Sequence, residues 1–298
     1  MPNTLVHLGV QGVATRALLR DADLKWVYIG CIIPDLPWIL QRIMRLPFSG
    51  LDLYDLRLYA IVQSSLCFCL LLSLALAMLS THFWRTFAIL GINSFLHLLL
   101  DACQTKWANG VHFLAPFNWQ LINFGLFWPE SFITYVLTGF GLAYFVWSCR
   151  VSVKIPVDLK WQPGIRVLAL FALLTAYFAT PIMLLDGPEK ANNHFVRTLR
   201  IQQERTGRYV EFDRVAYNDN ASRGALRTCA QEELTVDDMS LNRSAVVSLR
   251  GAFVTRDRIR IEEYHVHNYL IRNSASFLGL SLVTLLWVDA VRRKNAQG

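Results

Sequence analysis

The sequence predicts a mainly α-helical, polytopic membrane protein with five or six membrane segments and a small β-rich insertion before the last helix. Two compositional observations predict this class: 54% of the 298 residues are hydrophobic and only 17% are charged, against about 25% in an ordinary soluble domain. The third observation is where the charges lie. Residues 186–268 hold 13 basic and 13 acidic residues, so the net charge of +7 belongs to the remainder, where the basic residues flank apolar runs. Such flanks are typical of the cytoplasmic ends of transmembrane helices, and without a basic, aromatic-interleaved stripe we expect no nucleic acid as a partner.

The first two apolar segments are interrupted by polar residues. Residues 3–20 have an amphipathic pattern that includes His7, and residues 24–40 are apolar except around Pro34, Asp35 and Pro37. Non-helical backbone at membrane depth has to be buried in protein or line a wet cavity. We therefore expect residues 24–40 to form a broken or re-entrant helix.

Five later runs are long enough to cross a hydrocarbon core of roughly 30 Å, which takes about 20 apolar residues in a helix. They are residues 58–80, 83–103, 131–149, 165–185 and 269–290. The last run ends in Trp287 and a basic tail, Arg292-Arg293-Lys294. An aromatic residue followed by basic residues is typical of an anchor at the membrane interface.

The segment between the last two runs changes its period. Apolar and polar residues alternate in 208–217, 245–254 and 258–267, and Thr255-Arg256-Asp257 separates the last two stretches. This pattern predicts a β-hairpin within a small sheet or barrel. A compact five-stranded barrel of the oligonucleotide/oligosaccharide-binding shape fits the length and the strand spacing. We therefore divide the chain into a helical membrane domain (1–185), a β-rich module (186–268) and a final helix with its tail (269–298).

The short loops predict the orientation. The loop 150–166 carries Arg150, Lys154, Lys160 and Arg166 against one acidic residue, so this loop and the basic C-terminus are expected in the cytoplasm. Residues 104–130 and 186–268 are then extracytoplasmic. The expected location is the inner (plasma) membrane of a bacterium, with membrane lipids as partners.

Ionisable residues within the apolar runs are the functional candidates, because burying them in a membrane is costly. His97 and Asp101 are four residues apart and share one helix face. An imidazole and a carboxylate on one face suit a divalent ion such as Zn²⁺, but the same pair is also compatible with a structural His–Asp hydrogen bond. Asp35 is either a buried carboxylate or a solvated cap, and His7 taken alone is typical of a surface residue.

The order of these residues resembles a known family. A histidine followed two residues later by glycine (His7, Gly9), a G-x-x-x-P-D turn at residues 30–35, and His-x-x-x-Asp at residues 97–101 occur in that order, before Gly110 and Pro116. Residues 1–130 thus resemble the predicted membrane-bound metal-dependent hydrolases and, more distantly, zinc-dependent phospholipase C. The resemblance implies four metal ligands, with Zn²⁺ or Mn²⁺ as the cofactor and with Asp35 and Asp101 in catalysis: His7, Asp35, His97 and Asp101.

One position departs from the family pattern. Gln63 stands where the family has a further histidine, at the start of the next membrane helix. An amide oxygen is a weaker zinc ligand than an imidazole. The departure predicts fewer metal ions, weaker binding or lost catalysis.

Two functions follow as expectations. The first is metal-assisted hydrolysis of a lipid or lipid-linked phosphoester or ester at the outer face of the membrane. The alternative is a catalytically degenerate scaffold whose β module binds a protein or a glycan. A transporter would predict two similar halves, and the sequence has no internal repeat. His112 and Glu130 are further candidates for the metal shell, with an ordinary interfacial role as the alternative. His265 and His267 alternate on one strand face, and two histidines without a carboxylate partner are expected to be solvated.

Overall fold

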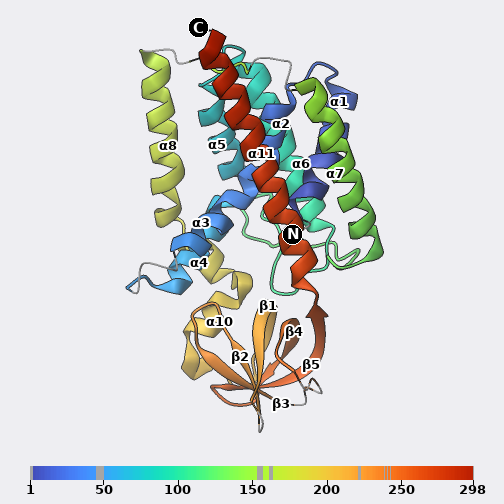
Figure 1. Ribbon diagram of the computed structural model, residues 1–298. Coiled ribbons are helices and arrows are strands. Elements are labelled where there is room, and N and C mark those ends of the chain that lie inside the picture. The colour runs from blue at the N-terminus through green and yellow to red at the C-terminus, as the bar shows by residue number, and fades with distance from the viewer. Residues whose placement is uncertain are drawn as a thin grey trace.

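The computed structural model describes residues 3–44, 50–152, 157–160, 164–220, 223–237, 239, 241 and 243–297. A bundle of helices stands on a closed barrel of five strands, which comes just before the last helix (Figure 1). The helices are α1 (Thr4–Leu18), α2 (Leu24–Ile32), α3 (Leu36–Met44), α4 (Leu53–Gln63), α5 (Leu66–Ala77), α6 (Phe83–Ala102), α7 (Phe132–Ser152), α8 (Ile165–Met183), α9 (Asp186–Lys190), α10 (Val196–Arg200) and α11 (Tyr269–Gln297). The mainly helical class predicted from the composition is confirmed. Lys154, one of the basic residues used to orient the chain, lies outside the described residues.

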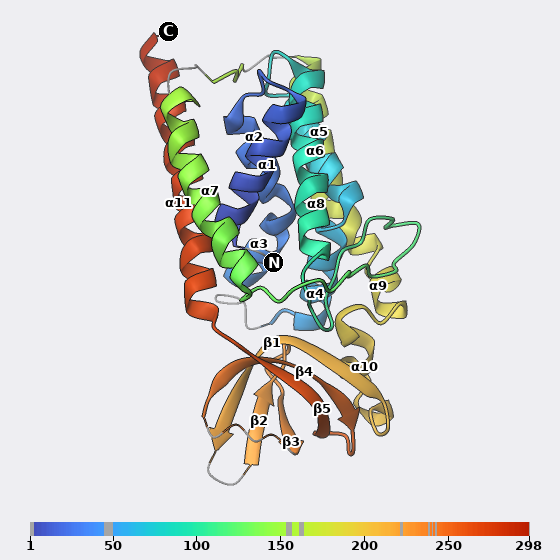
Figure 2. The ribbon, with the colours of Figure 1, turned by 90° about the vertical axis from the view of Figure 1, so that its right-hand side faces the viewer.

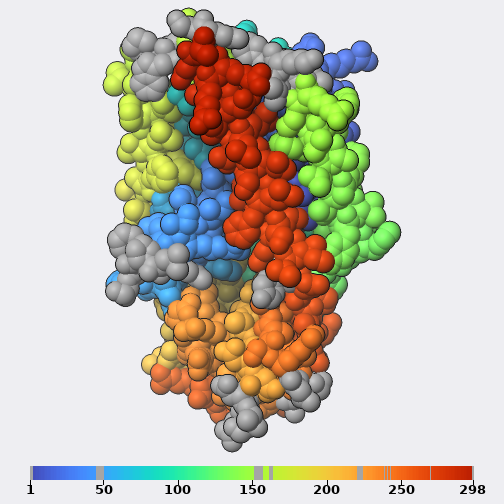
Figure 3. All heavy atoms as spheres, in the orientation of Figure 1, coloured from blue at the N-terminus to red at the C-terminus, as the bar shows by residue number. Residues whose placement is uncertain are grey.

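Within the described part of the chain, four helices are long and apolar enough to cross a membrane: Phe83–Ala102, Phe132–Arg150, Ile165–Lys190 and Leu270–Ala296. Helices α7, α8 and α11 expose large apolar side chains such as Phe132, Leu168 and Phe277 on their outer faces. Figure 3 shows α11 running along one face of the bundle. Extensive apolar surface of this kind marks a protein or membrane contact, so the structure is compatible with an integral membrane protein.

The apolar composition of residues 58–80 predicts one continuous helix, but the structure has two helices there. Helices α4 and α5 meet at a bend of 68° and form a broken span or a re-entrant loop. The hydroxyls of Ser64 and Ser65 donate to the carbonyls of Ile61 and Val62. Hydroxyl bonds of this kind compete with the helix ladder, and the amide of Leu66 instead donates to a carbonyl of the 104–130 loop.

The expected break in residues 24–40 is present. Helix α2 ends at Ile32, a 3₁₀ turn (η1, Ile33–Asp35) follows, and α3 continues as a separate helix. Gly30 lies against α6, where an added Cβ would stand 2.7 Å from the Cβ of Asn93. This close approach brings the turn that carries Asp35 against the helix that carries His97.

The barrel has the strands β1 (Tyr209–Asn220), β2 (Arg223–Arg227), β3 (Glu233–Asp237), β4 (Ala245–Phe253) and β5 (Arg258–His267). Its closed order is β1-β2-β3-β5-β4, with antiparallel pairs except for the parallel pair β3–β5. The predicted hairpin is β4–β5, paired from Phe253 with Ile259 to Val246 with His267. Strands β2 and β3 were not predicted individually, because each has only five residues.

The barrel and the C-terminal end of α11 lie at opposite ends of the molecule (Figure 2). The loop between α6 and α7 lies at the barrel end, where the amide of Ala108 donates to Glu211 on β1 over 2.6 Å. Residues 104–130 and the barrel are thus on one side of the bundle, as the loop charges predict. Arg42 and Arg57 differ from the other basic flanks, because they lie at this same end and line a cavity with barrel residues.

Candidate metal centre

Three elements of the helical domain bring the four predicted residues together. His7 comes from α1, Asp35 from η1, and His97 and Asp101 from one face of α6. His7 Nε2 lies 3.6 Å from Asp101 Oδ1, His97 Nε2 lies 3.9 Å from Asp101 Oδ2, and His97 Nε2 lies 3.7 Å from Asp35 Oδ1. His7, His97 and Asp101 form a group that could hold a metal ion, and Asp35 adjoins this group through His97.

Hydrogen bonds at Nδ1, the nitrogen that points away from the carboxylates, fix both imidazole rings. His97 Nδ1 lies 2.5 Å from the carbonyl oxygen of Cys31, and His7 Nδ1 lies 2.9 Å from the side-chain amide of Gln11. The two rings stack with their centroids 3.7 Å apart and their planes at 4°. Because the carbonyl of Cys31 accepts a hydrogen bond from His97 Nδ1–H, the Nε2 atom of His97 keeps its lone pair for a cation. Such a second bond is characteristic of histidines that ligate metals.

The atoms that face one another are buried but unsatisfied. Within the described residues, no hydrogen-bond partner exists for His7 Nε2, His97 Nε2, Asp35 Oδ1 or Asp101 Oδ1. Buried polar atoms without a partner cost free energy, and four in one place call for a shared ligand. Ligands about 2.1 Å from a tetrahedral Zn²⁺ lie about 3.4 Å from one another. The observed spacings of 3.6 to 3.9 Å are close to this, so the residues fit a divalent cation.

Lys106 completes the charge balance of the cluster. Its Nζ lies 3.1 Å from Asp101 Oδ2, and both side chains are almost fully buried. This ion pair engages Oδ2 of Asp101 and leaves Oδ1 to face His7. Sequence reasoning missed Lys106, which lies in the 104–130 loop. A single lysine after a helix carries no spacing signal that would place it on a carboxylate.

Gln63 lies apart from these contacts. Its Nε2 donates to the carbonyl of Tyr177 on α8 and to the hydroxyl of Tyr59, each over 3.1 Å. The amide therefore links α4 to α8. What the substitution at this position does to metal binding stays a prediction.

A polar cavity of about 220 Å³ begins at Asp101 and ends at Asp213 and Arg214 of the barrel. Its wall carries more positive than negative charge: Arg42, Arg57, Lys106, Arg214 and Arg272 against Asp101 and Asp213. Among the described residues, Arg57 Nε and both Nε and Nη2 of Arg214 are buried without an acceptor. Unsatisfied guanidinium donors in a closed, basic cavity suit an anion with several oxygens, such as phosphate.

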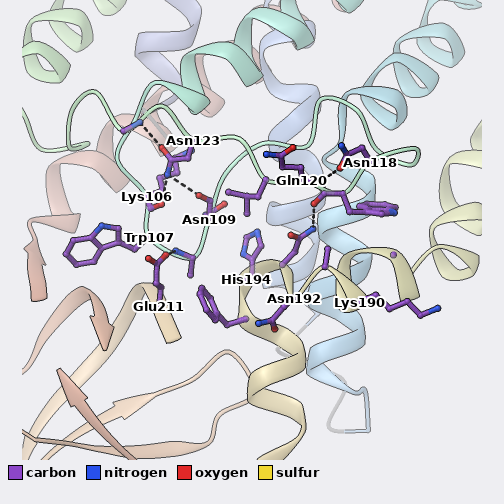
Figure 4. Close-up of a pocket in the computed structure, with 18 of the residues that line it drawn as sticks. Lys106, Trp107, Asn109, Asn118, Gln120, Asn123, Lys190, Asn192, His194 and Glu211 are labelled. Carbon is purple, nitrogen blue, oxygen red and sulfur yellow. Dashed lines mark hydrogen bonds between the residues drawn. The ribbon is translucent and has the colours of Figure 1, made fainter. Parts of the chain in front are cut away.

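A larger, open groove of about 1000 Å³ adjoins the polar cavity and shares Lys106 and Asn109 with it. Figure 4 shows amide and aromatic side chains around this groove, between the α6–α7 loop and the segment near α9. His194 lies at its edge, and burial lowers the pKa of His194 well below the usual value. The groove and the polar cavity thus share part of one wall at the barrel end.

A third cavity, of about 340 Å³, reaches Asp35 between α3 and α11. Its surface is mainly apolar, with Ile39, Phe277 and Leu280 among the residues that line it. It shares three residues with the polar cavity: Trp38, Arg42 and Arg272. The metal centre thus adjoins a polar space on one side and an apolar space on the other.

The remaining candidates are not at this centre. His112 lines the polar cavity and bonds Asn193 over 2.8 Å, and burial lowers its pKa to about 4. Glu130 lies instead beside His265 and His267, and these three form a second group that could hold a metal ion. The expectation that the two strand histidines are solvated for want of a carboxylate is therefore wrong. Their carboxylate comes from a loop more than 130 residues earlier in the chain.

Comparisons with protein-family models, with curated proteins and with solved structures find no match to this chain. The resemblance to membrane-bound metal-dependent hydrolases stays a prediction.

Proposed function

We propose that this chain is an integral membrane, metal-dependent hydrolase that cleaves a phosphoester of a lipid or lipid-linked molecule. The observation that carries the proposal is the position of the metal centre between two cavities of opposite character. Trp38, Arg42 and Arg272 belong to both cavities. An amphipathic substrate can place its phosphate in the polar cavity and its chain in the apolar one, with the reacting bond beside Asp35 and Asp101.

The residues divide the work as follows. His7, His97 and Asp101 hold the cation, Zn²⁺ by preference and Mn²⁺ as the alternative, and Asp35 completes the site. A bound divalent cation supplies Lewis-acid polarisation of a phosphoryl oxygen and lowers the pKa of a coordinated water. Lys106 pairs with Oδ2 of Asp101 and so holds that carboxylate at the cluster. Asp35 Oδ1 is buried without a hydrogen-bond partner among the described residues, so Asp35 is the carboxylate placed to accept a proton from the attacking water.

The arginines of the shared wall position the substrate. Arg42 and Arg272 reach both spaces, so they bind phosphate oxygens at the boundary between head group and chain. Arg57 and Arg214 supply further donors from α4 and from the barrel. This closed arrangement excludes bulk water from the reacting phosphate.

The proposed orientation follows the positive-inside rule. Arg150, Arg292 and Arg293 lie at the end of the bundle that is remote from the barrel. A cytoplasmic position for that end places the barrel and the substrate cavities at the outer face of a bacterial inner membrane.

The alternative is a scaffold whose extracytoplasmic side binds a protein or a glycan. The open groove of Figure 4 favours a glycan as the partner, because amide and aromatic side chains such as Asn118, Gln120 and Trp119 line it. In that alternative the four-residue cluster is a structural hydrogen-bond network. It then requires no metal.

Measuring the metal content and the turnover of the detergent-purified protein distinguishes the hydrolase from the scaffold. The hydrolase predicts stoichiometric zinc or manganese that falls by one equivalent in His97→Ala and in Asp101→Ala, with His82→Ala on the exposed turn as the control. It also predicts phosphate or head-group release from phospholipids or polyprenyl phosphates in mixed micelles, abolished in Asp35→Asn. A folded wild-type protein from which His97→Ala removes no metal would overturn the proposal.

A further inference from the structure

Glu130, His265 and His267 meet where the barrel joins the helical domain. His265 and His267 are two residues apart on β5, so both side chains lie on one face of the strand. Glu130 ends the loop that leads into α7. Glu130 Oε1 lies 2.8 Å from His267 Nδ1, and Glu130 Oε2 lies 3.6 Å from His265 Nε2. The cluster thus joins two parts of the chain that are far apart in sequence.

A hydrogen bond holds the ring of His267, and stacking on an indole holds the ring of His265. His267 Nε2 lies 2.8 Å from the hydroxyl of Ser248, which in turn donates to Asp213 over 3.2 Å. His265 stacks on the indole of Trp128, with centroids 3.9 Å apart and planes at 4°. A bond on the far nitrogen of a ligating histidine fixes its tautomer and its orientation. Here it leaves Nδ1 of His267 facing the carboxylate.

Two of the facing atoms lack a partner. Within the described residues, Glu130 Oε2 and His265 Nε2 are buried without a hydrogen bond, and their separation of 3.6 Å is too long for one. A cation between them would satisfy both atoms. Two imidazoles and one carboxylate, with a fourth position left for water, form a ligand set typical of Zn²⁺.

The order Ser248–His267–Glu130 also has the connectivity of a hydrolytic triad. Ser248 is completely buried, however, and its hydroxyl already accepts from the amide of Arg214 and donates to Asp213. A substrate carbonyl cannot reach this oxygen. The serine therefore positions His267 and is not a nucleophile.

We propose that Glu130, His265 and His267 bind a second divalent cation, Zn²⁺ in preference to others, which fastens the last barrel strand to the loop entering α7. This site shares no ligand with the centre on α1 and α6. Because Asp213 lines the polar cavity and is linked to His267 through Ser248, the cation also steadies the barrel side of that cavity.

Zinc stoichiometry of the full-length protein tests the proposal. The detergent-purified chain is stripped with a chelator, titrated with Zn²⁺ alone, and its metal content is measured after gel filtration. His265→Phe removes the ligand nitrogen but keeps an aromatic ring to stack on Trp128, and Glu130→Gln is the second variant. His82→Phe, on an exposed histidine that pairs with Asp158 instead, is the matched control.

The expected result is that His265→Phe and Glu130→Gln each lose one zinc equivalent relative to the wild type, whereas His82→Phe loses none. Loss of one equivalent in His97→Ala identifies the other centre. The two outcomes are therefore separable: a wild type that binds a single zinc, lost in His265→Phe but kept in His97→Ala, supports this site and overturns the other. Folded His265→Phe and Glu130→Gln variants with the stoichiometry of the wild type would overturn this proposal.

Discussion

Replacing Lys106 with methionine tests whether the cluster around Asp101 is a metal centre. The Lys106 ammonium lies 3.1 Å from Asp101 Oδ2, and the two side chains are 2% and 4% exposed. The attraction over this distance is about 5 kcal/mol at an effective dielectric constant of about 20. Removing one partner of a buried pair costs about 3–5 kcal/mol, because the remaining charge loses its compensation. We expect Lys106→Met to destabilise the metal-free protein by about that amount.

Zinc should reverse much of this loss. A divalent cation at the centre compensates the charge of Asp101 directly, and in the variant it no longer meets repulsion from the ammonium group. The zinc-induced rise in Tm, followed by intrinsic tryptophan fluorescence in detergent, should therefore be larger in Lys106→Met than in the wild type. Lys190→Met is the control, because Lys190 pairs with Asp186 at 3.3 Å with both side chains more than three-quarters exposed, where ion pairs contribute little. Equal zinc shifts in the variant and the wild type would refute the reasoning.

Two further predictions concern the packing and the pH response of the site. Gly141→Ala should lower zinc affinity and should lower the stability by about 1–3 kcal/mol, because its Cβ would stand 2.0 Å from the carbonyl oxygen of Leu5 and push α1, with His7, away from α7. Calorimetric zinc titrations measure the affinity, and Gly139→Ala, with open space around its Cβ, is the control. Equal zinc affinities in the two variants would contradict the prediction. Burial lowers the pKa of His112 to about 4, whereas a histidine in the unfolded chain titrates near 6.5. Between these two pH values the unfolded state binds more protons than the folded state. The stability therefore falls as the pH drops from about 6.5 toward 4. His112→Gln should remove about 2 kcal/mol of the loss between pH 7 and pH 5, measured by denaturant titration at both pH values, and an unchanged loss would count against a neutral, buried His112.

The helical class and the metal cluster could be predicted because both leave a local signal. In an apolar N-terminal half, the few ionisable residues are conspicuous, and the spacing of His97 and Asp101 already puts them on one face. The ordered resemblance added His7 and Asp35; the fold brings His7 and His97 against Asp101, and Asp35 against His97.

The cavity walls and the second cluster could not be predicted, because they depend on contacts between distant parts of the chain. Arg42 beside an apolar run has the same sequence signature as an orientation signal, yet it lines a cavity with barrel residues. Glu130 and His267 are 137 residues apart, and no periodicity connects them. The bend between α4 and α5 has neither proline nor glycine to mark it; it lies at Ser64 and Ser65, whose hydroxyls donate to carbonyls three residues earlier.

The position of the barrel bears on the choice between hydrolase and scaffold. The barrel face toward the helices is engaged: Glu211 accepts from the amide of Ala108, and Asp213 accepts from the side chain of Asn109 over 2.9 Å. Asp213 and Arg214 then form the end of the polar cavity that begins at Asp101. A module evolved only to capture a partner has no need to close a charged cavity in the helical domain, whereas a hydrolase needs that closure to hold a phosphate away from bulk water. The barrel therefore belongs to the proposed substrate site as one of its walls, and a chain without it would leave the guanidinium-lined cavity open to solvent.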